Sequence, residues 1–258
     1  RGGLRLPSGI LAGENILFFL TMKSGNSAGI ADFNKLSIPF RAVAADINTG
    51  KAAVLGFGSL PMAMRASMSI PGAFKPISID GQLLVDGGMV NQVPIDVVRA
   101  MGADIVIAVD VGTPLAVIDD QSSILAIGNQ VTGFLTVGNT DASVATLTEK
   151  DVLIRPQLGD DVTTTSFDPE KIALALAIGE EAAILASDRL AVLSEPSVPL
   201  RQITPSPDSK AMISFIELNN NSLYEDVIFQ STLAPLNGKP LDYDQIAKLF
   251  KEIYGQYP

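Results

Sequence analysis

Two short stretches of the sequence carry residues whose types and spacing could do chemistry. Gly25-Asn26-Ser27-Ala28-Gly29 fits the pattern G-x-S-x-G, in which a serine on a sharp turn acts as a nucleophile. Asp86-Gly87-Gly88 places a carboxylate at the end of an expected strand, where two glycines let another group approach the backbone closely. Because ligands of open α/β sheets bind at such strand ends, Asp86 could belong to a functional site. The simpler interpretation is that Asp86 is an ordinary turn aspartate.

The absence of two residue types limits that chemistry. The chain has no histidine, which excludes Ser-His-Asp triads, Cys-His pairs and H-E-x-x-H zinc sites within it. It also has no cysteine, so thiolate nucleophiles, disulfides and zinc-thiolate sites are excluded. A hydrolase built from this sequence must therefore take its base from a carboxylate, a lysine or a metal held by oxygen ligands.

Charge and hydropathy exclude further classes of protein. The net charge is −10 and no cluster of Lys and Arg occurs, so we expect no nucleic-acid partner. No run of about 18 uncharged apolar residues appears, so we expect no membrane-spanning helix. With 47% hydrophobic residues among 258, the chain has enough apolar material for a packed core.

Hydrophobic patterning predicts alternating strands and helices over residues 1–195. The tight-turn pair Asp80-Gly81 predicts a hairpin that leads into Asp86. The apolar run 104–112 is typical of a strand covered on both faces, and Asp168 with Pro169 predicts the start of one long helix over 168–193. Further strands are expected at 38–46, 51–56 and 151–158, and helices at 59–69, 93–103, 121–137 and 142–149. This alternation predicts a three-layer α/β domain with a mainly parallel sheet.

The composition changes after residue 195. Residues 196–209 contain four prolines and little periodicity, which predicts a linker. Residues 210–258 then predict a strand, a helix, a loop containing Asn237-Gly238 and a second helix from Asp242. With one predicted strand and two helices, this second segment cannot form a complete sheet by itself.

Residues 38–50, "IPFRAVAADINTG", and 64–112, from "MRASMSIPGAF" through "LLVDGG" to "IVIAVDVG", strongly resemble the patatin-like phospholipases. The resemblance implies a lipid acyl hydrolase of the phospholipase A type that uses a Ser-Asp dyad and no histidine, metal or organic cofactor. Asp86 would be the general base, with Gly87 and Gly88 completing its motif. Arg65, Ser69, Pro71 and Gly72 match a framework segment beside that site. Phospholipids and a membrane surface are the implied partners.

The resemblance to the patatin-like phospholipases also affects the interpretation of Ser27. A nucleophilic serine of this kind follows a buried strand and precedes a helix, whereas "FLTMKS" before Ser27 ends in polar residues. Ser27 also lies only 59 positions before Asp86, closer than the family places its nucleophile. We therefore interpret residues 24–30 as a loop and expect the nucleophile and the oxyanion loop upstream of Arg1. The alternative keeps Ser27 as the nucleophile, with its Oγ about 2.6–3.2 Å from Asp86.

The C-terminal segment resembles a POTRA domain that lacks its last two strands. The pattern rests on Asn221, Leu223, Gly238, Pro240, Leu241 and Asp242. A patatin-like domain followed by a POTRA domain resembles the type V secreted phospholipases of bacteria. That order implies an outer-membrane barrel as a partner and a location at the bacterial cell envelope, surface-exposed or secreted. The alternative is a catalytically inactive fragment, or a secretion or binding module.

Overall fold

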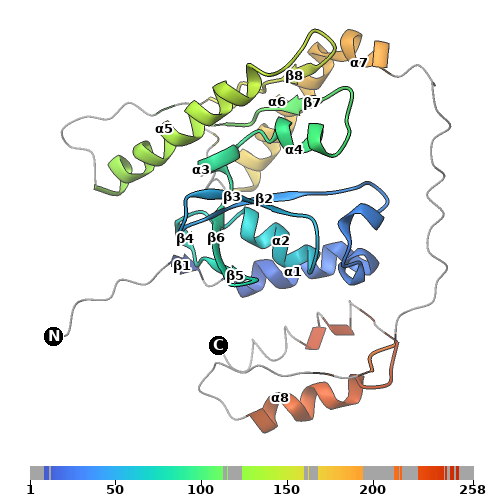
Figure 1. Ribbon diagram of the computed structural model, residues 1–258. Coiled ribbons are helices and arrows are strands. Elements are labelled where there is room, and N and C mark those ends of the chain that lie inside the picture. The colour runs from blue at the N-terminus through green and yellow to red at the C-terminus, as the bar shows by residue number, and fades with distance from the viewer. Residues whose placement is uncertain are drawn as a thin grey trace.

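The computed structural model describes residues 9–11, 13–112, 115, 124–159, 162, 168–193, 212–214, 216, 226–240, 242, 245–246 and 248–249. Helices and strands alternate along the N-terminal 193 residues, as the sequence predicts for an α/β protein (Figure 1). The predicted linker 196–209 lies outside the described residues, so the proposed domain boundaries stay predictions.

The largest sheet carries Asp86 and has four antiparallel strands in the order β3-β2-β6-β5. They are β2 (Ala42–Asp46), β3 (Lys51–Leu55), β5 (Ile77–Ile79) and β6 (Gln82–Asp86). The turns at 47–50 and 80–81 join strand pairs directly, and connections this short can only link antiparallel strands. The expectation of a mainly parallel sheet is therefore wrong for the described residues, while the predicted hairpin ending at Asp86 is confirmed.

Among the described residues, parallel pairing occurs in two pairs of short strands. Strand β1 (Gly9–Leu11) pairs with β4 (Gly72–Phe74), and β7 (Ile107–Val109) pairs with β8 (Val152–Ile154). Helices connect most of these strands (Figure 1). They are α1 (Glu14–Ser24), α2 (Leu60–Ser67), α3 (Gly88–Asn91), α4 (Ile95–Ala100), α5 (Ile124–Val144), α6 (Pro169–Leu185) and α7 (Ser187–Leu193), with 3-10 turns at Gly25–Gly29 and Phe33–Lys35.

Small side chains set the packing between α2 and the antiparallel sheet. Ala44 of β2, Ala53 of β3 and Ala66 of α2 form a buried cluster with Leu84 of β6. Alanines on both sides of this contact let the helix lie close to the strands, and the buried apolar surface stabilises that arrangement. Ser59 begins α2, since its side chain accepts a hydrogen bond from the Met62 N–H. The sheet and α2 thus form a rigid base beneath Asp86.

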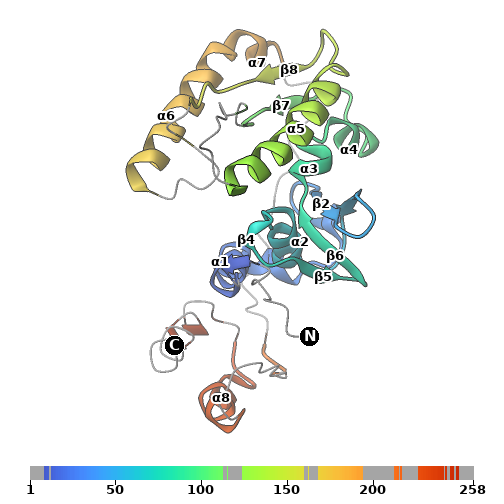
Figure 2. The same cartoon turned by 90° about the vertical axis from the view of Figure 1, so that its left-hand side faces the viewer.

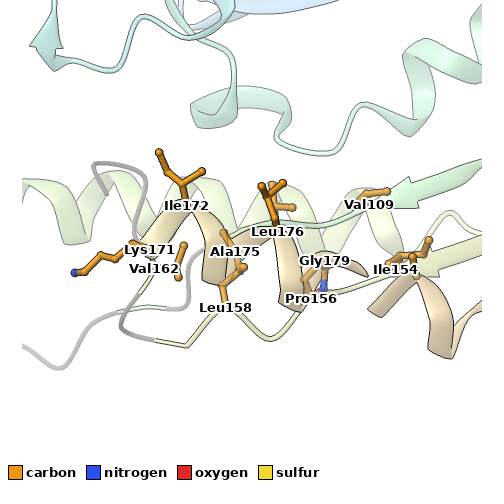
Figure 3. Close-up of a pocket in the computed structure, with 12 residues that line it drawn as sticks. Val109, Ile154, Pro156, Leu158, Val162, Lys171, Ile172, Ala175, Leu176 and Gly179 are labelled. Atoms are coloured by element: carbon orange, nitrogen blue, oxygen red, sulfur yellow. The ribbon is translucent and has the colours of Figure 1, made fainter. Parts of the chain in front are cut away.

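Strand β7 is covered on one face only by the described residues. Val106 and Ala108 are buried against Val93 and Ile95, whereas the alternate residues Ile107 and Val109 are 51% and 50% exposed. The expectation of a strand covered on both faces is therefore wrong for one face. That face borders an apolar groove of about 490 Å³ between β7, β8 and α6, where Ile172, Ala175 and Leu176 lie along the helix (Figure 3).

The long helix expected over 168–193 is interrupted. It begins as predicted, because the Asp168 side chain accepts a hydrogen bond of 2.8 Å from the Glu170 N–H and Pro169 occupies the first turn. It ends at Leu185, where Ala186 leaves the helical conformation with ψ near 1°, and α7 begins at Ser187. Ser187 and Asp188 suit a new helix start better than a helix interior.

The C-terminal segment is described only in part. Helix α8 (Asp226–Leu233) leads into a 3-10 turn, Ala234–Leu236. Met212 and Pro240 form an antiparallel bridge, and the Ile213 carbonyl accepts a hydrogen bond of 2.8 Å from the Gly238 N–H. These contacts place residues 212–213 beside the predicted turn at 237–238. Within the described residues, no helix is both long and apolar enough to cross a membrane.

Candidate active site

Asp86 is the last residue of β6 and lies opposite Ala44 of β2 in the sheet register. Its backbone N–H donates a hydrogen bond of 3.0 Å to the Ser69 carbonyl. Its side chain then turns toward the chain that follows, where Oδ1 accepts a hydrogen bond of 2.8 Å from the Gly88 N–H. Both the backbone and the carboxylate of Asp86 are therefore held in place.

The two glycines after Asp86 are required by close approach. A Cβ atom at Gly87 would lie 2.1 Å from the backbone oxygen of Val43, which is far inside van der Waals contact. A Cβ at Gly88 would lie 2.1 Å from Gln92 Oε1 and 3.0 Å from Asp86 Oδ1. The Gln92 side chain could move, but the backbone of β2 is fixed in the sheet. Gly87 is thus the stricter of the two requirements.

Burial changes the acidity of Asp86. Loss of solvent around the carboxylate raises the pKa of Asp86, and this effect exceeds the opposing effect of the Gly88 N–H, which lowers the pKa by stabilising the anion. A carboxylate with a raised pKa is a stronger base than an exposed aspartate. Asp86 is therefore better suited to accept a proton than an ordinary turn aspartate.

An open cleft of about 420 Å³ gives access to the carboxylate. Apart from Asp86, Arg41 is the charged side chain among the described residues that line it, and the Arg41 guanidinium donates to the Phe40 carbonyl and to Asn34 Oδ1. The other lining residues are Phe40, Ala42, Val43, Met64, Ser67, Met68, Gly87, Gly88, Asn91, Gln92 and Pro94. The cleft thus combines apolar and neutral polar residues with one carboxylate and one guanidinium.

The framework segment supports the end of β6. Arg65 is 1% exposed, and its guanidinium donates a hydrogen bond of 2.6 Å to Ser69 Oγ and lies over the Phe74 ring. Ser69 Oγ in turn donates to the Arg65 carbonyl at 2.8 Å. Because the Ser69 carbonyl receives the Asp86 N–H, this buried pair fixes the strand end that presents the carboxylate.

Ser27 lies in a different local structure from that of a nucleophile elbow. It sits in the 3-10 turn Gly25–Gly29, directly after helix α1, and its carbonyl accepts a hydrogen bond from the Ile30 N–H. A helix, not a strand, therefore leads into Ser27. Within the described part of the chain, Ser27 is not among the residues lining the Asp86 cleft, and the Asp86 carboxylate is hydrogen-bonded to Gly88.

One contributor to the site was not found from the sequence. Asn139 of α5 donates to the Gly88 carbonyl at 2.9 Å and accepts from the Gln92 N–H at 2.8 Å. Figure 2 shows α5 lying beside α3, the single helical turn that follows Asp86. Asn139 is 53 residues from Asp86 and matches no motif, so no pattern in one sequence could have indicated this contact.

Comparison with known proteins links this site to a family. Residues 57–99, which include Asp86, Gly87 and Gly88, match the model of the patatin-like phospholipases. An uncharacterized NTE family protein of Mycobacterium tuberculosis is 38% identical over 102 residues, which is 40% of this chain and 27% of the relative. Patatin-like phospholipase domain-containing protein 7 of Mus musculus is 46% identical over 80 residues, which is 30% of this chain and 6% of the relative.

A third relative matches with similar identity over a similar length. Patatin-like phospholipase domain-containing protein 6 of Homo sapiens is 44% identical over 80 residues, again 6% of that protein. The chain therefore matches between 6% and 27% of the length of these relatives. These findings support a patatin-like phospholipase domain around Asp86.

Proposed function

We propose that the chain carries the base half of the active site of a lipid acyl hydrolase of the phospholipase A type. One observation carries the proposal: the Asp86 carboxylate lies at an open, mostly apolar cleft, inside the segment that matches the patatin-like phospholipases. The raised pKa of Asp86 supports the role of proton acceptor. The substrate is a phospholipid or another acyl-ester lipid presented at a membrane surface.

The proposed reaction uses a serine from a part of the parent protein outside this chain. Asp86 takes the serine proton as the serine oxygen bonds to the ester carbonyl carbon, and backbone N–H groups stabilise the resulting oxyanion. The carbon–oxygen bond to the alcohol then breaks, and the protonated Asp86 returns its proton to the leaving oxygen. Water next attacks the acyl-enzyme and loses a proton to Asp86. The bond from the acyl carbon to the serine oxygen then breaks, and Asp86 gives that proton to the serine oxygen, which releases the fatty acid and restores the serine and the carboxylate.

The local structure of Ser27 bears on where the nucleophile lies. The alternative nucleophile within the chain is Ser27, which needs its Oγ within hydrogen-bond reach of Asp86. The 3-10 turn that holds Ser27 favours the external serine.

The cellular setting is a separate part of the proposal. We infer a POTRA-like segment over 210–258, and with it a partner barrel in the outer membrane and a place at the bacterial cell envelope. Support comes from the sequence pattern at Gly238, Pro240 and Asp242, together with the pairing of Met212 with Pro240. If residues 210–258 act without the catalytic domain, the alternative is a secretion or binding module.

Release of fatty acid from phospholipid vesicles by the parent protein tests the catalytic proposal. Asp86→Asn keeps the shape of the side chain but removes the base, so hydrolysis is expected to fall about 10²–10⁴-fold. Asp80→Asn is the matched control, because Asp80 lies exposed in the hairpin turn with a positive φ that asparagine also tolerates. Equal activity of the Asp86→Asn and wild-type proteins would contradict the proposal.

A further inference from the structure

Helix α3 is a single turn, and a side chain from α5 takes the place of its next backbone hydrogen bond. In a continuing helix, the Gln92 N–H would donate to the Gly88 carbonyl four residues earlier. Here the amide of Asn139 lies between the two groups. Asn139 Oδ1 accepts from the Gln92 N–H at 2.8 Å, and Asn139 Nδ2 donates to the Gly88 carbonyl at 2.9 Å.

The orientation of the Asn139 amide is defined by its three partners. Nδ2 carries two hydrogens, and the second donates to the Leu135 carbonyl of the same helix at 2.8 Å. Reversing the amide would set Nδ2 against the Gln92 N–H and Oδ1 against two carbonyls, and all three hydrogen bonds would be lost. Asn139 therefore suits this position in a way that neither aspartate nor leucine could reproduce.

Helix α5 also holds the next part of the chain. Ser143, one turn after Asn139, donates from Oγ to the Val93 carbonyl. The polar side chains Asn139 and Ser143 thus hold residues 88–93 at two points, while only the first point involves Gly88. Since Gly88 is the residue whose N–H binds the Asp86 carboxylate, the two points differ in their connection to the site.

We propose that Asn139 is a positioning residue for Asp86. By bridging the Gly88 carbonyl and the Gln92 N–H, it holds the single turn of α3 in place. The Val90 and Asn91 N–H groups of that turn donate to the Gly87 carbonyl, and this fixes the Gly87–Gly88 peptide so that its N–H points at the Asp86 carboxylate. The inference rests on the proposed function, since it assigns Asn139 to the reaction only through Asp86. Asn139 is not among the described residues that line the cleft.

The charges around Asp86 determine how replacement of Asn139 can be detected. The neutral residues that line the cleft with Asp86 include Met64 and Ser67 of α2, Met68 just after it, Gly88 and Asn91 of α3, and Gln92, and Arg41 is the charged residue among the described lining residues. Because Asn139 is uncharged, its replacement changes no charge near Asp86. A changed titration of Asp86 that is accompanied by a shift of the Gly88 amide proton would therefore report the altered hydrogen bond from Gly88.

Carbon-13 NMR of the full chain tests the proposal by following the Asp86 carboxyl group as pH is varied. Asn139→Ala is expected to raise the titration midpoint of Asp86 and to move the Gly88 amide proton upfield, because the Gly88 N–H no longer holds the carboxylate. Ser143→Ala, which removes the neighbouring hydrogen bond to Val93, is the matched control and should leave both signals unchanged. Equal shifts in the two variants, or none in Asn139→Ala, would overturn the proposal.

A measurement on the unaltered chain covers the case in which Asn139→Ala fails to fold. A scalar coupling across the hydrogen bond from the Gln92 nitrogen to the Asn139 side-chain carbonyl carbon is expected, and its absence would overturn the proposal. In the parent protein, Asn139→Ala should lower kcat about tenfold with KM unchanged. If Asp86→Asn abolishes hydrolysis while Asn139→Ala leaves it intact, this inference fails and the proposed function stands.

Discussion

The N–H of Gly88 donates a hydrogen bond of 2.8 Å to the carboxylate of Asp86, two residues before it. The same short loop therefore presents the carboxylate and stabilises its charged form. Burial acts in the opposite direction and dominates, so the pKa of Asp86 lies above that of an exposed aspartate. The predictions below follow from this balance and from the packing that maintains it.

Asp86→Asn should make the chain more stable at pH 7. A carboxyl group whose pKa is raised on folding opposes folding once it is ionised, so the destabilisation is present at neutral pH and disappears as pH falls below the pKa of the unfolded carboxyl. Thermal unfolding of wild-type and Asp86→Asn chains at pH 7 and pH 4 measures this difference. An equal or lower Tm for the variant at pH 7 would show that the burial of Asp86 costs nothing.

Hydrolysis by the parent protein should decline with acid at a higher pH than an ordinary aspartate would produce. Asp86 must be ionised to accept the serine proton, so kcat/KM falls as pH drops through its pKa, which is raised above the usual value of about 3.9. The acid limb of the profile of kcat/KM against pH reports that pKa. A limb centred at or below the usual value would argue against Asp86 as the base.

Gly87→Ala should destabilise the chain by about 1–3 kcal/mol. The new methyl group would lie 2.1 Å from the Val43 carbonyl oxygen, and strand β2 cannot move away without breaking its pairing with β3 and β6. Gly138→Ala is the control, because nothing lies near its Cβ position in α5 and alanine favours a helix. Urea unfolding should show the first variant weakened and the second unchanged or stabilised.

Asp151 should make stability depend on acid. Its buried carboxylate accepts hydrogen bonds from the N–H groups of Val106 and Thr148 and from the Arg99 guanidinium, which hold the pKa of Asp151 well below its usual range. A depressed pKa contributes stability above the unfolded value of about 3.9, and this contribution is lost as pH falls below it.

The contribution of Asp151 can be isolated by comparison. The Tm of the wild-type chain should drop between pH 5 and pH 3 more steeply than that of Asp151→Asn, which has no carboxylate to protonate. Asp80→Asn, at an exposed turn, should follow the wild-type curve. Parallel curves for the wild-type and Asp151→Asn chains would show that Asp151 is not the source of the acid-dependent loss of stability.

Local patterns predicted the elements around Asp86 well. The Asp80-Gly81 turn, the strand ending at Asp86 and the N-cap at Asp168 all appear as expected, since each depends on neighbours in sequence. The strand predicted over 38–46 is found at Ala42–Asp46, where all five residues are buried, whereas Ile38 lies exposed before it. These features follow from turn chemistry and hydrophobic patterning alone.

Long-range contacts could not be predicted in the same way. The single exposed face of β7 depends on which other elements pack against it, and an apolar run does not specify them. The break at Ala186 has no proline or glycine to mark it. Asn139 reaches Gly88 across 51 positions, and an isolated asparagine in a helix resembles any exposed polar residue.

Covalent labelling with a fluorophosphonate probe tests the central claim most directly. This chain alone should not be labelled, whereas the parent protein should be labelled, with labelling strongly reduced by Asp86→Asn and unaffected by Ser27→Ala. Such a result would show that the chain supplies the base and another part of the protein supplies the nucleophile. Labelling of the chain alone that is abolished by Ser27→Ala would contradict the account and identify Ser27 as the nucleophile.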